Sequence, residues 1–192
     1  ASKAQSLNYN AISDQTRTIS IGKAGQTISI TSTPSNPTAL DTYTFAATAS
    51  SGAAVTATID SASSSVCSIL NNVVTYLTSG SCVINANQGG NANFNPATTV
   101  TQTISVARAM DIITIPTLAD RTVFSTNLTV SATSLSNVQL TYTSVPQAGN
   151  VFNCSITTSG TLTLITPGRC EIEVTHPDGS VYAAATNTAR FM

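Results

Sequence analysis

The 192 residues are 41% hydrophobic and only 8% charged, against about 25% charged in an average soluble domain, and the formal net charge is −1. The seven Lys and Arg residues are scattered and form no basic stripe, so we expect no nucleic-acid partner. No apolar run approaches the ~20 residues that span a bilayer, so we expect no membrane insertion.

Alternation of apolar and polar residues predicts an all-β chain. Threonine and valine, which favour strands, are abundant, and helix-forming stretches are absent. In the first half we expect strands at residues 27–30, 43–47, 55–59, 66–69, 73–77, 82–86 and 100–106, and in the second half the same plan from 113–115 to 186–192. About seven short strands in 80 residues, separated by Gly, Pro, Asn and Ser, are typical of a β-sandwich.

An internal repeat organises the chain. The segment 8–24 recurs as 93–109 with a constant offset of 85 residues, and the offset grows to 88 towards the end of the second copy. A period of this length fits one sandwich domain per copy. We therefore predict the final strand of a preceding repeat in residues 1–24 and complete domains in residues 25–109 and 110–192.

The four cysteines occur as one pair per copy, Cys67 with Cys82 and Cys154 with Cys170. A Cys₄ metal site would usually contain close C-x₂₋₄-C pairs, so the spacing favours one disulfide per domain over a metal site. Cys82 alternates in phase with the apolar residues that follow it, which predicts that the cysteines point into the core. Disulfides indicate an oxidising compartment, so we expect an extracellular or cell-surface protein.

The stretch from Val66 to Ala86 resembles the most recognisable part of bacterial Ig-like (Big) domains. It contains a short strand, a V-T-x-L strand, a turn that ends at Gly80, and a strand of the T-x-x-I-x-A type; the second copy repeats this plan around Gly168. Glycine suits a reversal that needs positive φ. The resemblance implies tandem Ig-like domains like those of invasin- and intimin-like adhesins and other large surface or fibre proteins. The cysteine pairs depart from the commonest pattern and imply a cysteine-bearing subfamily.

The densest charge in the chain lies at Arg169, Glu171 and Glu173, where the first copy has Val83 and Asn85 at the two acidic positions. Paired carboxylates can perform acid–base chemistry, but these three side chains alternate onto the outward face of one strand. We interpret them as a solvated strand face, with a recognition patch as the alternative.

Other polar residues give weaker indications of chemistry. His176, the only histidine, precedes a Pro-Asp-Gly turn, and we expect an ordinary loop residue there. Asp14, Asp111 and Asp120 are too widely spaced for a calcium loop, so we expect no metal and no cofactor. Lys23 is replaced by Arg108 in the next copy, which argues against an isopeptide bond and for a basic residue at the domain junction.

The junction between the two complete domains is short. Only residues 107–111 separate the expected strands, without a flexible spacer, so the domains should stack end to end. Tyr9, Phe94 and Tyr182 recur just before the final strand of each copy, which indicates core or junction packing.

These features together predict a non-enzymatic extracellular structural or adhesive module of a cell-surface or fibre protein. Its expected partners are neighbouring Ig-like repeats and a host or prey surface protein or glycan. The alternative is a dedicated carbohydrate- or receptor-binding domain at a fibre tip, with the second copy as the binding end.

Overall fold

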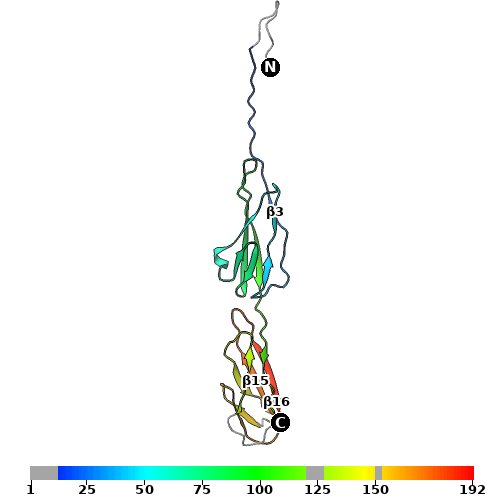
Figure 1. The fold of residues 1–192 in the computed structure, drawn as a ribbon, viewed down its shortest axis with the longest axis vertical. Coiled ribbons are helices and arrows are strands. Elements are labelled where there is room, and N and C mark those ends of the chain that lie inside the picture. Colours follow the sequence, from blue (N-terminus) through cyan, green and yellow to red (C-terminus); the bar gives the residue numbers. More distant parts are fainter. Residues whose placement is uncertain (1–12, 120–127, 150–152) are drawn as a thin grey trace, which may run out of the picture.

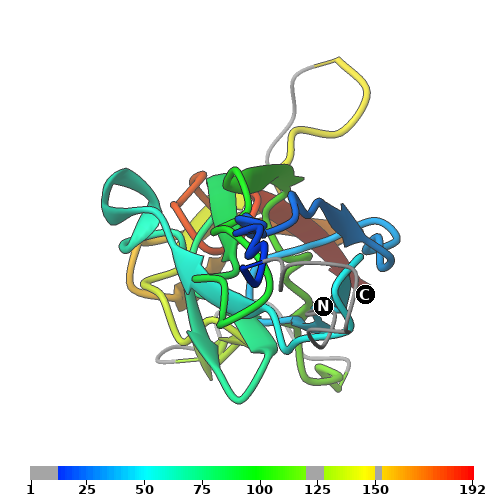
Figure 2. The same cartoon turned by 90° about the horizontal axis from the view of Figure 1, so that it is seen from above.

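The computed structural model describes residues 13–119, 128–149 and 153–192. Figure 1 shows two β-sandwiches that follow one another along the long axis, with residues 13–23 extending away from the first sandwich. Seen from above, in Figure 2, the sandwiches lie one behind the other, and the loop that follows residue 144 (yellow) stands away from them. The end-to-end arrangement expected from the short junction is therefore present.

The first sandwich contains eight short strands and one 3₁₀ turn. The strands are β1 (Ile28–Ile30), β2 (Thr42–Thr44), β3 (Ala47–Ala49), β4 (Thr56–Ile59), β5 (Cys67–Leu70), β6 (Val73–Tyr76), β7 (Gly80–Asn87) and β8 (Val100–Val106), with η1 (Ser61–Ser63) before β5. Only two residues separate β2 from β3, so the groups β1-β3 and β2-β6-β5 are successive parts of one layer. The other layer is β4-β7-β8.

The second sandwich repeats this topology. Its strands are β9 (Ile113–Thr114), β10 (Leu128–Thr129), β11 (Thr133–Ser134), β12 (Thr141–Ser144), β13 (Cys154–Ile156), β14 (Thr161–Leu164), β15 (Cys170–His176) and β16 (Ala185–Phe191). One layer joins β9-β11 with β10-β14-β13, and the other is β12-β15-β16. The prediction of an all-β chain with two sandwiches of about seven strands is confirmed, if each interrupted second strand is counted once.

Each sandwich has its own hydrophobic core between its layers. On β7, Cys82, Ile84 and Ala86 are fully buried and the residues between them are not. The corresponding residues on β15 are buried in the same alternation. Because burying an aliphatic side chain contributes about 1.5–3 kcal/mol, this strict alternation fixes the register of the central strand in both sandwiches.

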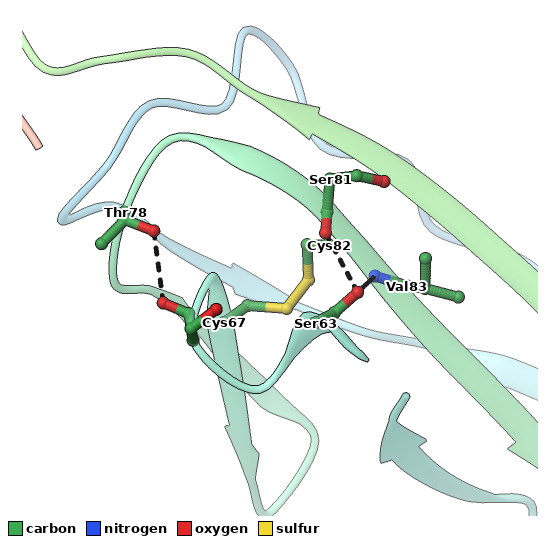
Figure 3. The surroundings of a disulfide bond; sticks show 7 residues. Ser63, Cys67, Thr78, Ser81, Cys82 and Val83 are labelled. Atoms are coloured by element: carbon green, nitrogen blue, oxygen red, sulfur yellow. Dashed lines mark hydrogen bonds between the residues drawn. A yellow bond between two sulfur atoms is a disulfide. The ribbon is translucent and has the colours of Figure 1, made fainter. Parts of the chain in front are cut away.

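One disulfide joins the two layers of each sandwich. Cys67 on β5 is bonded to Cys82 on β7, and Cys154 on β13 is bonded to Cys170 on β15, with Cα–Cα distances of 5.8 and 5.6 Å. Figure 3 shows how Ser63 supports the first bond: its hydroxyl donates to Ser81 O at 3.0 Å and accepts from Val83 N at 3.2 Å. The predicted pairing is confirmed, and the alternative of a Cys₄ metal site is excluded.

Gly80 and Gly168 adopt positive φ values of 141° and 137°, as the turn prediction required. A Cβ atom at Gly168 would lie 2.7 Å from Asn153 Nδ2, so this turn also depends on the missing side chain. Asn153 fills that space and anchors the turn, since its Nδ2 donates to Arg169 O at 3.0 Å. The turn therefore sets where β15 and its charged residues begin.

Candidate functional site

The predicted patch lies at the start of β15, the middle strand of its layer. Glu171 stands opposite Arg190 of β16, and Glu173 lies between Thr143 of β12 and Thr188 of β16. Both neighbouring threonines are exposed. The acidic side chains thus project from the outer face of the β12-β15-β16 layer, and the rest of that face is largely threonine.

Glu171 is more covered than the sequence predicted. Arg190 Nη2 lies 3.0 Å from Glu171 Oε1, and the side chain of Glu171 is only 12% exposed whereas that of Arg190 is 61% exposed. The hydrogen bond from Arg190 lowers the pKa of Glu171 below its ordinary value, against the opposing effect of burial. The charges of Arg190 and Arg169 and a hydrogen bond from Gln147 lower this pKa further. The same ion pair raises the pKa of Arg190.

Arg190 is thus a member of the charged group that sequence reasoning missed. It comes 19 residues after Glu171 on the next strand, and only the register of β15 against β16 brings the two together. In the first sandwich Asn85 makes a weak contact with Asp60 (Nδ2 to Oδ2, 3.4 Å) on the same outer face. The Glu171–Arg190 pair distinguishes the second sandwich from the first.

The expectation for His176 was wrong. It is the last residue of β15 and is buried, not a residue of an exposed loop. Its Nε2 lies 2.6 Å from Asp111 Oδ2, and its Nδ1 lies 2.7 Å from Pro177 O. The signal was present in the sequence: His176 continues the alternation of Cys170, Ile172 and Val174, and the Pro-Asp-Gly turn begins only after it.

Asp111 is the centre of this buried cluster. Its carboxylate accepts hydrogen bonds from Ser136 Oγ at 2.5 Å, from Ser136 N at 3.2 Å and from Ile112 N at 2.8 Å. Burial raises the pKa of Asp111, but the hydrogen bonds from Ser136 and Ile112 and the nearby His176 outweigh it, so that the net effect is to lower the pKa. The aspartate is therefore stabilised in its ionised form.

The same three residue types occur in serine hydrolases, but here they are connected differently. Ser136 donates to the carboxylate and not to the imidazole, and both nitrogens of His176 face oxygen acceptors. Nucleophilic catalysis needs a histidine nitrogen free to accept the serine proton. The cluster therefore ties chain segments together and does not activate Ser136.

Metal ligands were not expected, and the described residues contain no group of three or more His, Cys, Asp and Glu side chains that could hold a metal ion. Asp14 is exposed, and Asp111 is engaged with Ser136 and His176. Asp120 lies outside the described residues.

The junction between the sandwiches is built mainly by backbone groups. Ala109 N donates to Val181 O at 2.8 Å, and Ala183 N donates to Ala109 O at 3.0 Å, which forms a parallel bridge between Ala109 and Tyr182. Ser79 of the first sandwich adds two hydrogen bonds of 2.8 Å, from its N and its Oγ, to one carbonyl, that of Ser180.

The same bridge occurs one repeat earlier, between Ala24 and Phe94. In both described copies the recurring aromatic position therefore pairs with the segment that leads into its sandwich; Tyr9 lies outside the described residues. Arg108, the basic residue expected at the junction, pairs with Asp178 at 3.4 Å.

The segment before the first sandwich exposes apolar side chains. Ile19 is 77% exposed and Ile21 is 90% exposed. The repeat offset of 85 residues aligns them with Ile104 and Val106 on β8, which are both buried in the first core. The two positions are therefore apolar in both segments. On β8 their side chains are buried in the core, and in the segment before the first sandwich they are exposed among the described residues.

The strand order defines the class of protein. Each sandwich pairs its first, second, fifth and fourth strands in one layer and its third, sixth and seventh in the other, which is the order of seven-stranded immunoglobulin-type domains. The chain is therefore an all-β protein of tandem Ig-like sandwiches with one inter-layer disulfide in each.

Comparison with known proteins adds little to this class. Neither a family model nor a curated protein sequence matches the chain. Among solved structures, it is similar to two Drosophila N-cadherin fragments, EC1-4 and EC1-3, each with 13% identity, a TM-score of 0.32 and 87% of this chain covered. The match spans 47% and 63% of those chains.

A human protocadherin-24 EC1-2 fragment is similar at 10% identity and a TM-score of 0.32, with 81% of this chain and 88% of that chain covered. Similarity at this level of identity and TM-score does not indicate a function. In the part of the chain that the structure describes, no helix has the length and apolar character needed to cross a membrane.

Proposed function

We propose that the chain is part of a tandem array of Ig-like repeats that serves as a non-enzymatic structural and adhesive module of an extracellular surface or fibre protein. The observation that carries this proposal is the recurrence of one junction: Ala24 pairs with Phe94, and Ala109 pairs with Tyr182. Because the same contact recurs with each repeat, it can hold successive domains in one line along the chain.

In this proposal, residues 1–24 are the final strand of a preceding repeat, and residues 25–109 and 110–192 are complete domains. The exposed Ile19 and Ile21 support this division, because a preceding sandwich would bury them as Ile104 and Val106 are buried. Residues 1–12 of the proposed strand lie outside the described residues. The resemblance to bacterial Ig-like domains is the family assignment we propose for all three units.

The proposed location outside the cytoplasm rests on the disulfides. All four cysteines are paired in buried bonds that join the two layers. Such bonds form and persist in oxidising compartments and are rare where thiols are kept reduced.

Small-angle scattering of the oxidised chain tests the structural part of the proposal. A compact globule of this length would have a radius of gyration of roughly 16 Å, and we expect a clearly larger value with an elongated distance distribution. A control with a Gly/Ser insertion after Ala109 should show a broader distribution, because it separates the sandwiches without changing either core. A radius near that of the globule in the unmodified chain would refute a stacked array.

The second candidate function is recognition at a fibre tip, of a host or prey surface protein or a glycan. It is favoured by the group Arg169, Glu171 and Glu173, joined by Arg190, because this charge lies on a rigid strand face and the first sandwich lacks the Glu171–Arg190 pair. A glycan array and a cell-attachment assay, run with the wild type and with R169A/E171A/E173A, separate the two functions. Equal attachment of the wild type and the variant would contradict recognition by this charged group and would indicate that the chain is a spacer.

A further inference from the structure

A buried charged cluster at the junction end of the second sandwich has no part in the function proposed above. It consists of Asp111, Ser136 and His176, and the side chains of Asp111 and His176 are 0% and 1% exposed. Burying opposite charges is costly unless the pair is close and well solvated by hydrogen bonds. A protein that needed only stability at this position could use neutral residues.

The first sandwich does use neutral residues at the equivalent positions. Gln26, Ser51 and Gln88 align with Asp111, Ser136 and His176 at repeat offsets of 85, 85 and 88 residues. Ser51 Oγ donates to Gln26 Oε1 at 2.5 Å, as Ser136 donates to Asp111, and Gln26 Nε2 donates to Gln88 Oε1. The two clusters therefore share one architecture, and only the second one is ionised.

His176 contacts both Asp111 and the start of the following loop. Its Nδ1 lies 2.7 Å from Pro177 O and its Nε2 lies 2.6 Å from a carboxylate oxygen of Asp111. Both ring nitrogens therefore face oxygen atoms, and the imidazole lies between the carboxylate of Asp111 and the first carbonyl of the loop. Nε2 makes no well-aligned hydrogen bond, so its contact with Asp111 is close but poorly directed.

The cluster connects the two chain segments that form the junction. Asp111 lies two residues after Ala109, and His176 leads directly into the loop 177–183, whose backbone receives Ala109. The same loop accepts both hydrogen bonds of Ser79 from the first sandwich. A cavity of about 280 Å³ lies beside the cluster and is lined by Ser136, His176 and residues of this loop.

Few other ionisable groups surround the pair. From the loop, Asp178 is exposed and pairs with the exposed Arg108 of the linker, and Tyr182 is half-buried. From β16, the neutral Ala185 stands opposite His176, and from the segment after β11 the contact is the neutral Ser136. Among the described residues, Asp111 is the ionised group in contact with His176.

We propose that the Asp111–His176 pair is an acid-sensitive clasp on the junction: it holds the loop 177–183 against the linker while Asp111 is ionised, and it releases the loop when Asp111 is protonated. The Gln26–Gln88 pair is the corresponding clasp that does not respond to pH. Successive junctions of the same array therefore differ in their response to acid.

The direction follows from the surroundings of the carboxylate. Hydrogen bonds and His176 lower the pKa of Asp111 from its ordinary value of 3.8, so the pair contributes its full stability above that value and loses it as the pH falls through the lower folded-state value. Below that point His176 remains buried beside a carboxyl group that no longer carries a charge.

Hydrogen exchange of the full oxidised chain, followed by mass spectrometry and corrected for the intrinsic exchange rate at each pH, tests this proposal. In the wild type we expect protection of the loop 177–183 to fall by about tenfold or more between pH 6 and a pH below 3. Protection of the equivalent loop 88–96 should change by less than about twofold. The variant D111Q/H176Q, which reproduces the first clasp, should keep both loops protected, and D178N, which removes only the exposed pair, should behave as the wild type.

An equal loss of protection in wild type and D111Q/H176Q, or no loss in the wild type, would overturn the proposal. D111N provides a second test should the double variant not fold. It removes the charge at nearly constant shape, so the loop 177–183 should exchange faster already at pH 6 while the core strand β15 remains protected. Unchanged exchange of the loop in D111N would equally overturn the proposal.

Discussion

Removing one disulfide at a time should destabilise one sandwich and spare the other. The bond between Cys67 and Cys82 closes 15 residues of sequence, and the bond between Cys154 and Cys170 closes 16. Loops of this length reduce the entropy of the unfolded chain by an amount that corresponds to about 3 kcal/mol each. All four cysteines are buried, and changing them to Ala also leaves small voids, so we expect a total cost of about 3–4 kcal/mol per sandwich.

The assay must report on each sandwich separately, because a two-domain chain has no single unfolding transition. We suggest urea denaturation of C67A/C82A and C154A/C170A, followed by hydrogen exchange of peptides from β7 and from β15. Each double variant is the matched control for the other. A loss below about 1 kcal/mol in the altered sandwich would refute the loop-closure reasoning, and an equal loss in both would refute the independence of the two cores.

Three further predictions concern the charged residues of the second sandwich. Replacing Arg169, Glu171 and Glu173 together with Ala should change the free energy of unfolding by no more than about 1 kcal/mol, since Arg190, the partner of the covered Glu171, is 61% exposed and ion pairs that reach the solvent contribute little; thermal denaturation measures this, and a larger loss would mean that the face is structural. The NMR titration of Glu171 should give a pKa below its ordinary value, because Arg190 favours the ionised form, and R190A should raise it; an unchanged value in R190A would contradict the ion pair. Replacing His176 with Ala should cost about 3 kcal/mol or more in urea denaturation at neutral pH, because its carboxylate partner stays buried without a counter-ion, and a neutral effect would show that the pair contributes nothing.

Strand positions, core phase and disulfide pairing could be predicted from the sequence because each depends on local alternation or on the repeat. The alternation of Cys82, Ile84 and Ala86 identifies the buried face without knowledge of any partner strand. The cysteine pairs recur with the repeat, so one copy supports the interpretation of the other. These predictions needed no long-range register.

The residues that were missed depend on such register or on competing local signals. Arg190 could be assigned to Glu171 only by aligning β15 with β16. The repeat does not give this register, because Cys82 faces Ile104 whereas Cys170 faces Phe191, so that the offset is 88 residues on β15 and 87 on the last strand. His176 was interpreted from its Pro-Asp-Gly neighbours, although its own place in the alternation pointed inward. The alternation of buried and exposed residues extends to His176, the residue before the turn, and its side chain is buried beside Asp111.

The disulfides also determine how the chain would respond to a pulling force. Load applied to the two ends of the first sandwich enters near β1 and leaves near β8, while the 15 residues closed by the bond between Cys67 and Cys82 lie between them in sequence. When the sandwich ruptures, that loop cannot be drawn out, so the extension released is shorter by roughly 50 Å than for the reduced chain, at about 3.4 Å per residue. The oxidised chain would therefore refold from a shorter extension once the force is removed. In each sandwich the disulfide would keep the two layers covalently linked while they form again.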